Sequence, residues 1–255
     1  MIQADNLTGL AGLRHGFFTR QGGVSEGVFG SLNCGFSGGD EIDRVIENRS
    51  RALARLDLPP DSLCTVRQVH GADVVVARTP NPGPPQTHAD ALVTDRLGVT
   101  LGVLCADCAP VLIADREARV IGCAHAGWRG ALAGVIEATV DAMIDLGAKR
   151  EWICAAVGPC IAQASYEVGP DFREQIVGED AGTAALFEEV AGSDRPRFDL
   201  KAYALHRLAR AGVLDRCALT EDTYAEKTRF FSARRTRQSG AERFGLLLSA
   251  IALAE

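Results

Sequence analysis

The centre of the chain alternates short apolar runs with polar turns, and this pattern limits the fold more than any other feature. Its runs of five or six residues have the length of buried strands. They cover 101–105, 110–114, 120–124 and 152–157. Between the last two runs, residues 128–146 repeat apolar side chains at helical spacing, which predicts a long helix ended by Gly147. Strands alternating with helices predict an α/β or α+β chain with a substantial mixed sheet.

Shorter elements are expected on both sides of this centre. Three further helices are predicted over 43–56, 170–177 and 199–211. Asp199 is suited to cap the last of them, which Gly212 would end. Residues 74–76 and 230–232 read as strands, and the arginine-rich residues 234–243 read as a loop.

The remaining glycine- and proline-rich segments indicate turns within one unit. Residues 79–85 carry four prolines and are expected to form an exposed loop. Both sides of this loop read as sheet, so it connects parts of the same domain. Residues 1–255 are therefore predicted to form a single catalytic domain.

Charge and hydropathy exclude several classes of partner. Lys plus Arg number 27 and Asp plus Glu number 33, so the formal net charge is −6. Such a surface has no bulk attraction for nucleic acid or anionic lipid. The start of the chain lacks the pattern of a signal peptide, and the longest apolar stretch, 244–254, is too short to span a bilayer. A cytoplasmic protein without nucleic-acid or membrane partners is expected.

The eight cysteines are more easily explained as core residues and ligands than as disulfides. In a reducing compartment an even count is weak evidence for pairing. Cys105, Cys123 and Cys154 stand inside apolar runs, which predicts small core side chains. Cys108 differs, because it lies between two predicted strands.

Two of the five histidines stand near strand ends, where α/β sheets bind ligands. His70 precedes the strand at 74–76, and His125 lies where a strand gives way to a helix. Together with Cys108 they could hold a zinc ion with an open fourth position. The spacing matches no short metal motif, so a Cys108–His125 nucleophile pair and ordinary core or turn histidines remain alternatives.

Motifs along nearly the whole chain resemble the YfiH family, whose members carry names such as laccase domain protein, polyphenol oxidase and purine nucleoside phosphorylase. The matching segments are HGFFTR at 15–20, GGVS at 22–25, SLN at 31–33, RQVHG at 67–71, DALVT at 90–94, ADCAP at 106–110, HAGWRG at 125–130, GPCI at 158–161 and FSARR at 231–235.

This resemblance implies a four-layer αββα fold with a mixed β-sandwich. It implies that His70, Cys108 and His125 are both the catalytic site residues and the zinc ligands, with copper as another possible metal. It also implies phosphorolysis of adenosine, inosine and 5′-methylthioadenosine, with adenosine deamination as a second activity. Purine nucleosides and phosphate would then be the partners. The preferred nucleoside and the oligomeric state do not follow from the sequence.

Residues near these three form the expected substrate and phosphate site. Arg129 lies in the predicted first turn of a helix, beside glycines that let a ligand such as phosphate approach the backbone. A surface arginine beside packing glycines would explain the same sequence. Arg67 and Gln68 precede His70 and could line the same pocket. Asn33 could do likewise, although turn chemistry explains it nearly as well.

Three acidic residues stand in or beside these segments. Asp107, next to Cys108, could orient a ligand, relay a proton or cap a turn. Asp90 and Asp95 bracket a strand-like run and read as turn residues.

Two other activities compete with phosphorolysis. A copper polyphenol oxidase would use two His and one Cys as the trigonal part of a copper site. An oxygen-reducing cluster needs further histidines, but only His15, His88 and His206 remain and no His-X-His pair exists. An amide hydrolase that edits a peptidoglycan precursor would use zinc-bound water or Cys108 as nucleophile. A structural zinc protein ranks lower, because structural sites usually have four protein ligands.

Overall fold

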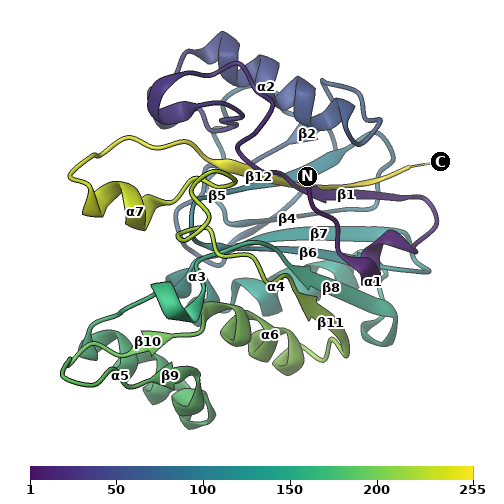
Figure 1. The fold of residues 1–255 in the computed structure, drawn as a ribbon. Helices are drawn as coiled ribbons and strands as arrows, with labels where there is room; N and C mark the ends of the chain where they lie inside the picture. Colours follow the sequence, from purple (N-terminus) through teal and green to yellow (C-terminus); the bar gives the residue numbers. More distant parts are fainter. Residues whose placement is uncertain (255) are drawn as a thin grey trace.

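Two β-sheets pack face to face in the computed structural model, which describes residues 1–254 (Figure 1). The larger sheet consists, in spatial order, of β11 (Asp215–Ala218), β8 (Ile153–Val157), β6 (Ala109–Asp115), β7 (Val120–Ala126), β4 (Ala91–Thr94) and β3 (Val74–Val76). The smaller sheet consists of β1 (Leu13–Phe17), β12 (Leu247–Leu253), β5 (Thr100–Cys105) and β2 (Leu63–Cys64). Both are mixed, because β11–β8, β3–β4 and β2–β5 pair parallel and their other pairs are antiparallel.

Helices and a short ribbon complete the described chain. The α-helices are α1 (Asp5–Thr8), α2 (Ile42–Ala54), α3 (Trp128–Ala133), α4 (Val135–Asp145), α5 (Pro170–Glu179), α6 (Leu200–Arg210) and α7 (Ala233–Gln238). Short 3₁₀ helices lie at η1 (Gly27–Phe29), η2 (Arg150–Trp152), η3 (Gln163–Ser165) and η4 (Ala181–Leu186). The ribbon pairs β9 (Phe187–Glu188) with β10 (Arg197–Phe198).

Four layers result from the way the apolar faces are buried. Strand β6 shows this directly, because Val111 and Ile113 join the core against α4 and α6, whereas Leu112 faces the core between the two sheets. On the other side of the molecule, Leu53 of α2 packs with Leu248 of β12. Helix α2 therefore covers the smaller sheet and α4 and α6 cover the larger one, as Figure 1 shows. The expected αββα arrangement is confirmed.

Most of the predicted elements are confirmed within a few residues. Helices α2, α5 and α6 match their predicted ranges, and the Asp199 side chain accepts a hydrogen bond from the Ala202 amide at 2.9 Å. The three cysteines assigned to the core, Cys105, Cys123 and Cys154, are buried. The proline-rich loop is mostly exposed, as predicted.

The helix predicted over 128–146 is wrong in one respect, because it is two helices. Gly134 separates α3 from α4 with a left-handed φ of 94° and serves as the C-cap of one and the N-cap of the other. A glycine adopts that conformation without steric cost, so the apolar spacing continues across a break in the backbone.

The assignments for residues 230–243 are also wrong in part. Phe230 and Phe231 lie in no strand; they are buried in a small apolar cluster with Leu247. The arginine-rich segment begins as α7, whose N-cap is Ser232, with its side chain accepting from the Arg235 amide. Capping by a serine that follows two buried aromatics explains why a helix forms where loop composition was expected.

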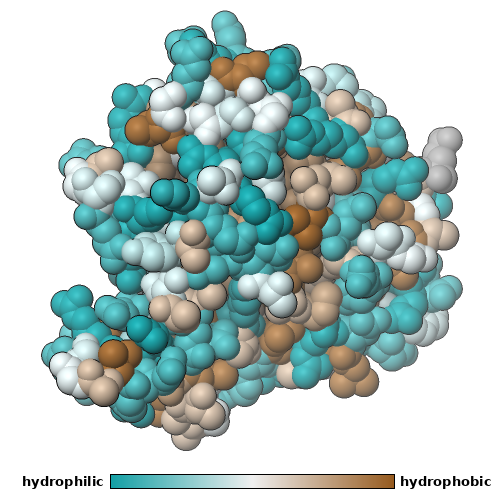
Figure 2. Space-filling model, viewed as in Figure 1, coloured by the Kyte–Doolittle hydropathy of each residue, from teal (hydrophilic) through white to brown (hydrophobic). Residues whose placement is uncertain are grey.

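The surface carries few large apolar side chains. Figure 2 shows one face that is mainly hydrophilic, with apolar side chains in small groups. Within residues 1–254, the helices are all too short or too polar to cross a membrane.

Candidate metal centre and active site

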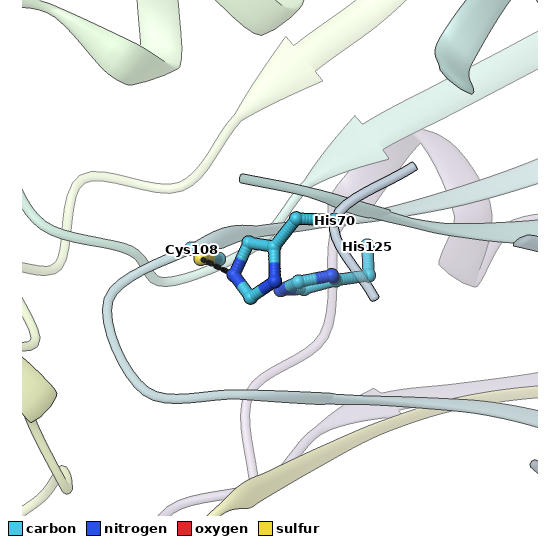
Figure 3. Close-up of side chains that lie close together, drawn as sticks. All are labelled: His70, Cys108 and His125. Atoms are coloured by element: carbon cyan, nitrogen blue, oxygen red, sulfur yellow. Dashed lines mark hydrogen bonds between the residues drawn. The ribbon is translucent and has the colours of Figure 1, made fainter. Parts of the chain in front are cut away.

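Three segments bring the predicted ligands together at one end of the central strands of the larger sheet. His70 lies between β2 and β3, Cys108 in the turn between β5 and β6, and His125 near the end of β7 (Figure 3). One ligand atom from each lies within 4.8 Å of the other two, and the Cys108 Sγ–His70 Nε2 distance is 3.8 Å. Tetrahedral zinc would hold S and N about 3.5 Å apart. The donors and their spacing therefore fit a metal ion with an open position, whichever metal it is.

The backbone around the cluster lets the segments that carry His70, Cys108 and His125 approach one another closely. His70 and Asp107 both adopt left-handed φ values, 62° and 91°. A Cβ at Gly127 would lie 2.9 Å from the Cys108 sulfur and 2.9 Å from the His70 ring. Only a glycine at this position lets β7 and its following helix pass so near both side chains.

Asp90 connects two of the three ligand segments. Its fully buried carboxylate accepts the amides of Val69, His70 and Gly71 at 3.0, 2.9 and 2.7 Å. The same carboxylate lies 2.8 Å from Nδ1 of His125, which leaves Nε2 of that ring for Cys108 or a metal. A carboxylate behind a ligating histidine fixes the ring's tautomer and direction. Asp90 is thus a positioning residue, and its interpretation as a turn residue is wrong.

The electrostatics of the cluster favour a thiolate. Burial alone would raise the pKa of the Cys108 thiol, but the charges and hydrogen bonds of His125 and His70 lower this pKa to about 6. Burial would lower the pKa of His125, but Cys108 and Asp90 raise it to about 9. Between these two pKa values, and so at neutral pH, the metal-free pair is a thiolate beside an imidazolium. The thiolate is the form that binds metals or attacks electrophiles.

The cluster opens into a cavity of about 1000 Å³ with an unusual charge. Its five arginine side chains are Arg49, Arg67, Arg129, Arg234 and Arg237. Among its described lining residues, Asp107 is the one carboxylate. A chain of net charge −6 thus concentrates positive charge at one concave site, which favours anionic ligands.

Asp107 is occupied by the protein itself. Its carboxylate accepts hydrogen bonds from the hydroxyls of Thr223 and Ser232 at 2.8 and 2.9 Å and from the Arg234 amide at 2.7 Å. These contacts tie the turn that carries Cys108 to the start of α7. Of the three explanations considered, capping is the one that the hydrogen bonds support.

The structure brings three of the four predicted substrate residues to the cavity. Arg67 and Arg129 are exposed on its lining, and the Arg129 guanidinium lies 4.7 Å from the centre of the Trp128 ring. Gln68 also lines it, but its amide bonds the backbone N–H and C=O of Leu104 at 2.8 and 2.7 Å. Gln68 therefore holds the His70 segment against β5.

Asn33 does not lie on the cavity wall. It is buried, donates to Asp40 at 2.9 Å and accepts the Leu246 amide at 2.9 Å. These contacts fasten a glycine-rich segment to the start of β12, which agrees with the turn interpretation.

Sequence reasoning missed two residues here. Asp90 gave one signal only, its place in the DALVT segment shared with the YfiH family. Arg49 gave none, because it is one of four arginines in the predicted helix 43–56, and such side chains are usually exposed to solvent.

A chain with this two-sheet fold and this cluster of side chains has known relatives. Residues 14–254 match the family described as multi-copper polyphenol oxidoreductase laccase, and the chain belongs to it. A purine nucleoside phosphorylase of Streptomyces griseus is 40% identical over 242 residues, covering 94% of this chain and 96% of that protein. The purine nucleoside phosphorylase YfiH of Escherichia coli is 40% identical over 229 residues, covering 87% and 88%.

Solved structures show the same fold. YlmD from Geobacillus stearothermophilus superposes with a TM-score of 0.88 at 29% identity, covering 99% of this chain and 94% of its own. A protein from Neisseria meningitidis gives a TM-score of 0.85 at 35% identity, with 96% of each chain covered. The predicted resemblance to the YfiH family is confirmed.

Proposed function

We propose that the protein is a zinc-dependent purine nucleoside phosphorylase acting on adenosine, inosine and 5′-methylthioadenosine, with adenosine deamination as a second activity. The observation that carries this proposal is the His70–Cys108–His125 cluster at the wall of an arginine-lined cavity. The names of the two 40% identical relatives support the reaction class.

Each part of the cavity has a task in this reaction. His70, Cys108 and His125 would hold zinc, which supplies a Lewis acid and lowers the pKa of a bound water. Arg129 and Arg67, exposed on the cavity wall, bind and orient the phosphate that attacks the anomeric carbon. Their charges also offset the negative charge that develops on the departing base. Trp128 and Tyr166 line the same cavity and would supply aromatic contacts to the purine.

The oxidase activity in the family's description is less consistent with the positions of the other histidines. His15 is buried in β1, where its Nε2 accepts the Ala4 amide at 2.9 Å. His206 pairs with Asp180 at 2.7 Å on α6, and His88 is exposed beside the proline-rich loop. Within residues 1–254, the one group of three or more potential metal ligands is His70, Cys108 and His125, so these other histidines form no second, histidine-rich cluster of the kind that multicopper oxygen reduction needs.

One observation favours an amide hydrolase as a second candidate. Cys108, His125 and Asp90 lie in the order of a nucleophile, a base and an orienting carboxylate, with His125 Nδ1 2.8 Å from Asp90. Such a hydrolase would remove a misincorporated serine from a peptidoglycan precursor. The same three residues serve a metal centre equally well, so product analysis decides between the two.

The test is product analysis on the metal-replete protein. Adenosine, inosine and 5′-methylthioadenosine are incubated with and without phosphate, and base, pentose 1-phosphate, free pentose and ammonia are quantified. We expect base and pentose 1-phosphate in equal amounts and only with phosphate present. Free pentose at equal rates without phosphate would make the enzyme a hydrolase. A serine-containing muramyl nucleotide, the peptidoglycan precursor of the second candidate, is incubated in parallel. Serine release from it, without nucleoside cleavage, would favour that candidate.

A further inference from the structure

One arginine of the cavity is buried rather than exposed. Arg49 of α2 is 3% exposed and lines the cavity together with Phe36, Ser37 and Val66. Its Nε donates to the Cys34 carbonyl at 2.9 Å, and Nη1 lies 3.4 Å from the Thr65 hydroxyl. Within residues 1–254, its Nη2 has no hydrogen-bond partner. Both N–H donors of Nη2, an atom that is itself buried, are therefore unsatisfied on a residue that lines the cavity.

The charge of Arg49 is also unbalanced. Within the described chain it forms no salt bridge, and the ring of Phe36 lies 4.2 Å from its guanidinium carbon. Burial lowers the pKa of Arg49 to about 10, so the group stays charged at neutral pH. A cation–π contact offsets only part of the cost of burying a charge. A bound anion would offset the rest.

We propose that the Arg49 end of the cavity is a subsite for a phosphate group, held by the Arg49 guanidinium. A phosphate dianion fits better than a carboxylate, because four further arginines line the same cavity and Asp107 is already hydrogen-bonded within the protein. The subsite is distinct from the phosphate position proposed at Arg129, because Arg129 lies on α3 and is exposed. The phosphate is either free inorganic phosphate or the ester group of a substrate such as a nucleoside 5′-monophosphate.

The experiment measures binding without turnover, by calorimetry in a phosphate-free buffer of low ionic strength. Inorganic phosphate alone and adenosine 5′-monophosphate alone are titrated into the metal-replete protein. Arg49→Met is compared with Arg51→Met, a control on the same helix whose side chain pairs with Glu47 and lies outside the cavity. We expect at least ~10-fold weaker binding in Arg49→Met and wild-type binding in Arg51→Met.

The two probes distinguish the sources of the phosphate. If Arg49→Met weakens binding of adenosine 5′-monophosphate alone, the subsite takes the ester group of a substrate. If Arg49→Met weakens binding of inorganic phosphate, the subsite takes the free ion. A folded Arg49→Met protein that binds both probes like the wild type would overturn the proposal, as would a wild-type protein that binds neither. Because no reaction is followed, failure of phosphorolysis with binding intact would contradict only the proposed function.

A second pair of variants covers the case in which Arg49→Met does not fold. Ser37 lines the same cavity and follows Phe36, whose ring contacts the Arg49 guanidinium. Because Ser37 is exposed, its replacement leaves the core untouched. Ser37→Asp places a negative charge beside the subsite, and Ser37→Asn is its neutral control. We expect Ser37→Asp to weaken phosphate binding several-fold relative to Ser37→Asn. Equal affinities in the two variants would overturn the proposal.

Discussion

The carboxylate of Asp90 lies 2.8 Å from Nδ1 of His125 and, through the same oxygen, 2.9 Å from the amide of His70. One buried side chain thus sets the ring direction of one candidate ligand and the backbone of another. Asp90 directly precedes β4, which pairs with β7, and its carbonyl accepts the His125 amide at 2.8 Å, so strand pairing holds this relationship. The candidate metal centre is therefore positioned by the larger sheet rather than by the loops alone.

Asp90→Asn should weaken metal binding without removing any ligand. The amide cannot accept from the three backbone N–H groups and from His125 as a carboxylate does, so the ligands lose their orientation. Loss of such a partner typically costs about 10–100-fold in metal affinity. Competition with a chromogenic chelator measures it. Asp95→Asn, at the other end of β4 with partly exposed ion pairs to Arg78 and Arg96, is the control. Equal affinities in both variants would contradict the role given to Asp90.

Gly127→Ala should displace two ligands at once. Its new methyl group would lie 2.9 Å from both the Cys108 sulfur and the His70 ring, closer than real Cβ contacts allow. We expect at least ~10-fold weaker metal binding and a loss of roughly 1–3 kcal/mol in the free energy of unfolding, as for overpacking elsewhere. Gly178→Ala is the control, because a Cβ there meets nothing within 4 Å. Wild-type zinc affinity in Gly127→Ala would show that the cluster is looser than described.

The Cys108 thiol should be the most reactive cysteine of the metal-free protein. With a pKa of about 6, it is a thiolate above that pH, whereas burial raises the pKa of Cys105 and Cys123. Iodoacetamide labelling, followed by mass spectrometry, should rise with a midpoint near pH 6 and vanish in Cys108→Ser. Restored metal should protect the residue. A midpoint near the ordinary thiol value of 9 would contradict the thiolate–imidazolium arrangement.

His15 should make the fold sensitive to acid. Burial lowers its pKa from 6.5 to about 4, so the unfolded chain takes up a proton at a higher pH than the folded chain does. Stability is therefore complete above pH 6.5 and is lost as the pH falls toward 4. His15→Gln should reduce the free energy of unfolding at neutral pH by roughly 1–2 kcal/mol, which lowers the melting temperature. It should also flatten the pH dependence of the melting temperature. The exposed His88→Gln should retain the wild-type profile; a shared loss of pH dependence would exclude His15 as the cause.

Much of the fold could be predicted because the larger sheet is buried on both faces. Strands such as β6 then read as unbroken apolar runs, and the helices that cover them show their own spacing. The break at Gly134 and the helix at 233–238 escaped prediction for a different reason. Each depends on a local backbone conformation or a cap, which apolar periodicity does not report.

The candidate site was predictable mainly through the shared motifs. Two histidines and a cysteine near strand ends left a metal site as one of several interpretations, the resemblance to the YfiH family implied it, and the structure brings the three residues together. Asp90 and Arg49 were not predictable, because their importance comes from burial and from partners distant in sequence. Asn33 was assigned to the substrate site because it stands in a shared motif, but it does not line the cavity, and its hydrogen bonds to Asp40 and Leu246 stabilise a turn.

The central claim is that His70, Cys108 and His125 form a single metal centre on which the activity depends. Metal content by plasma mass spectrometry, together with phosphate-dependent cleavage of adenosine, tests it in the wild type and in His70→Ala, Cys108→Ala and His125→Ala. The account predicts about one zinc per chain in the wild type, and loss of both zinc and cleavage in all three variants. Full zinc occupancy in the variants, or several copper ions in the wild type purified without added copper, would contradict it.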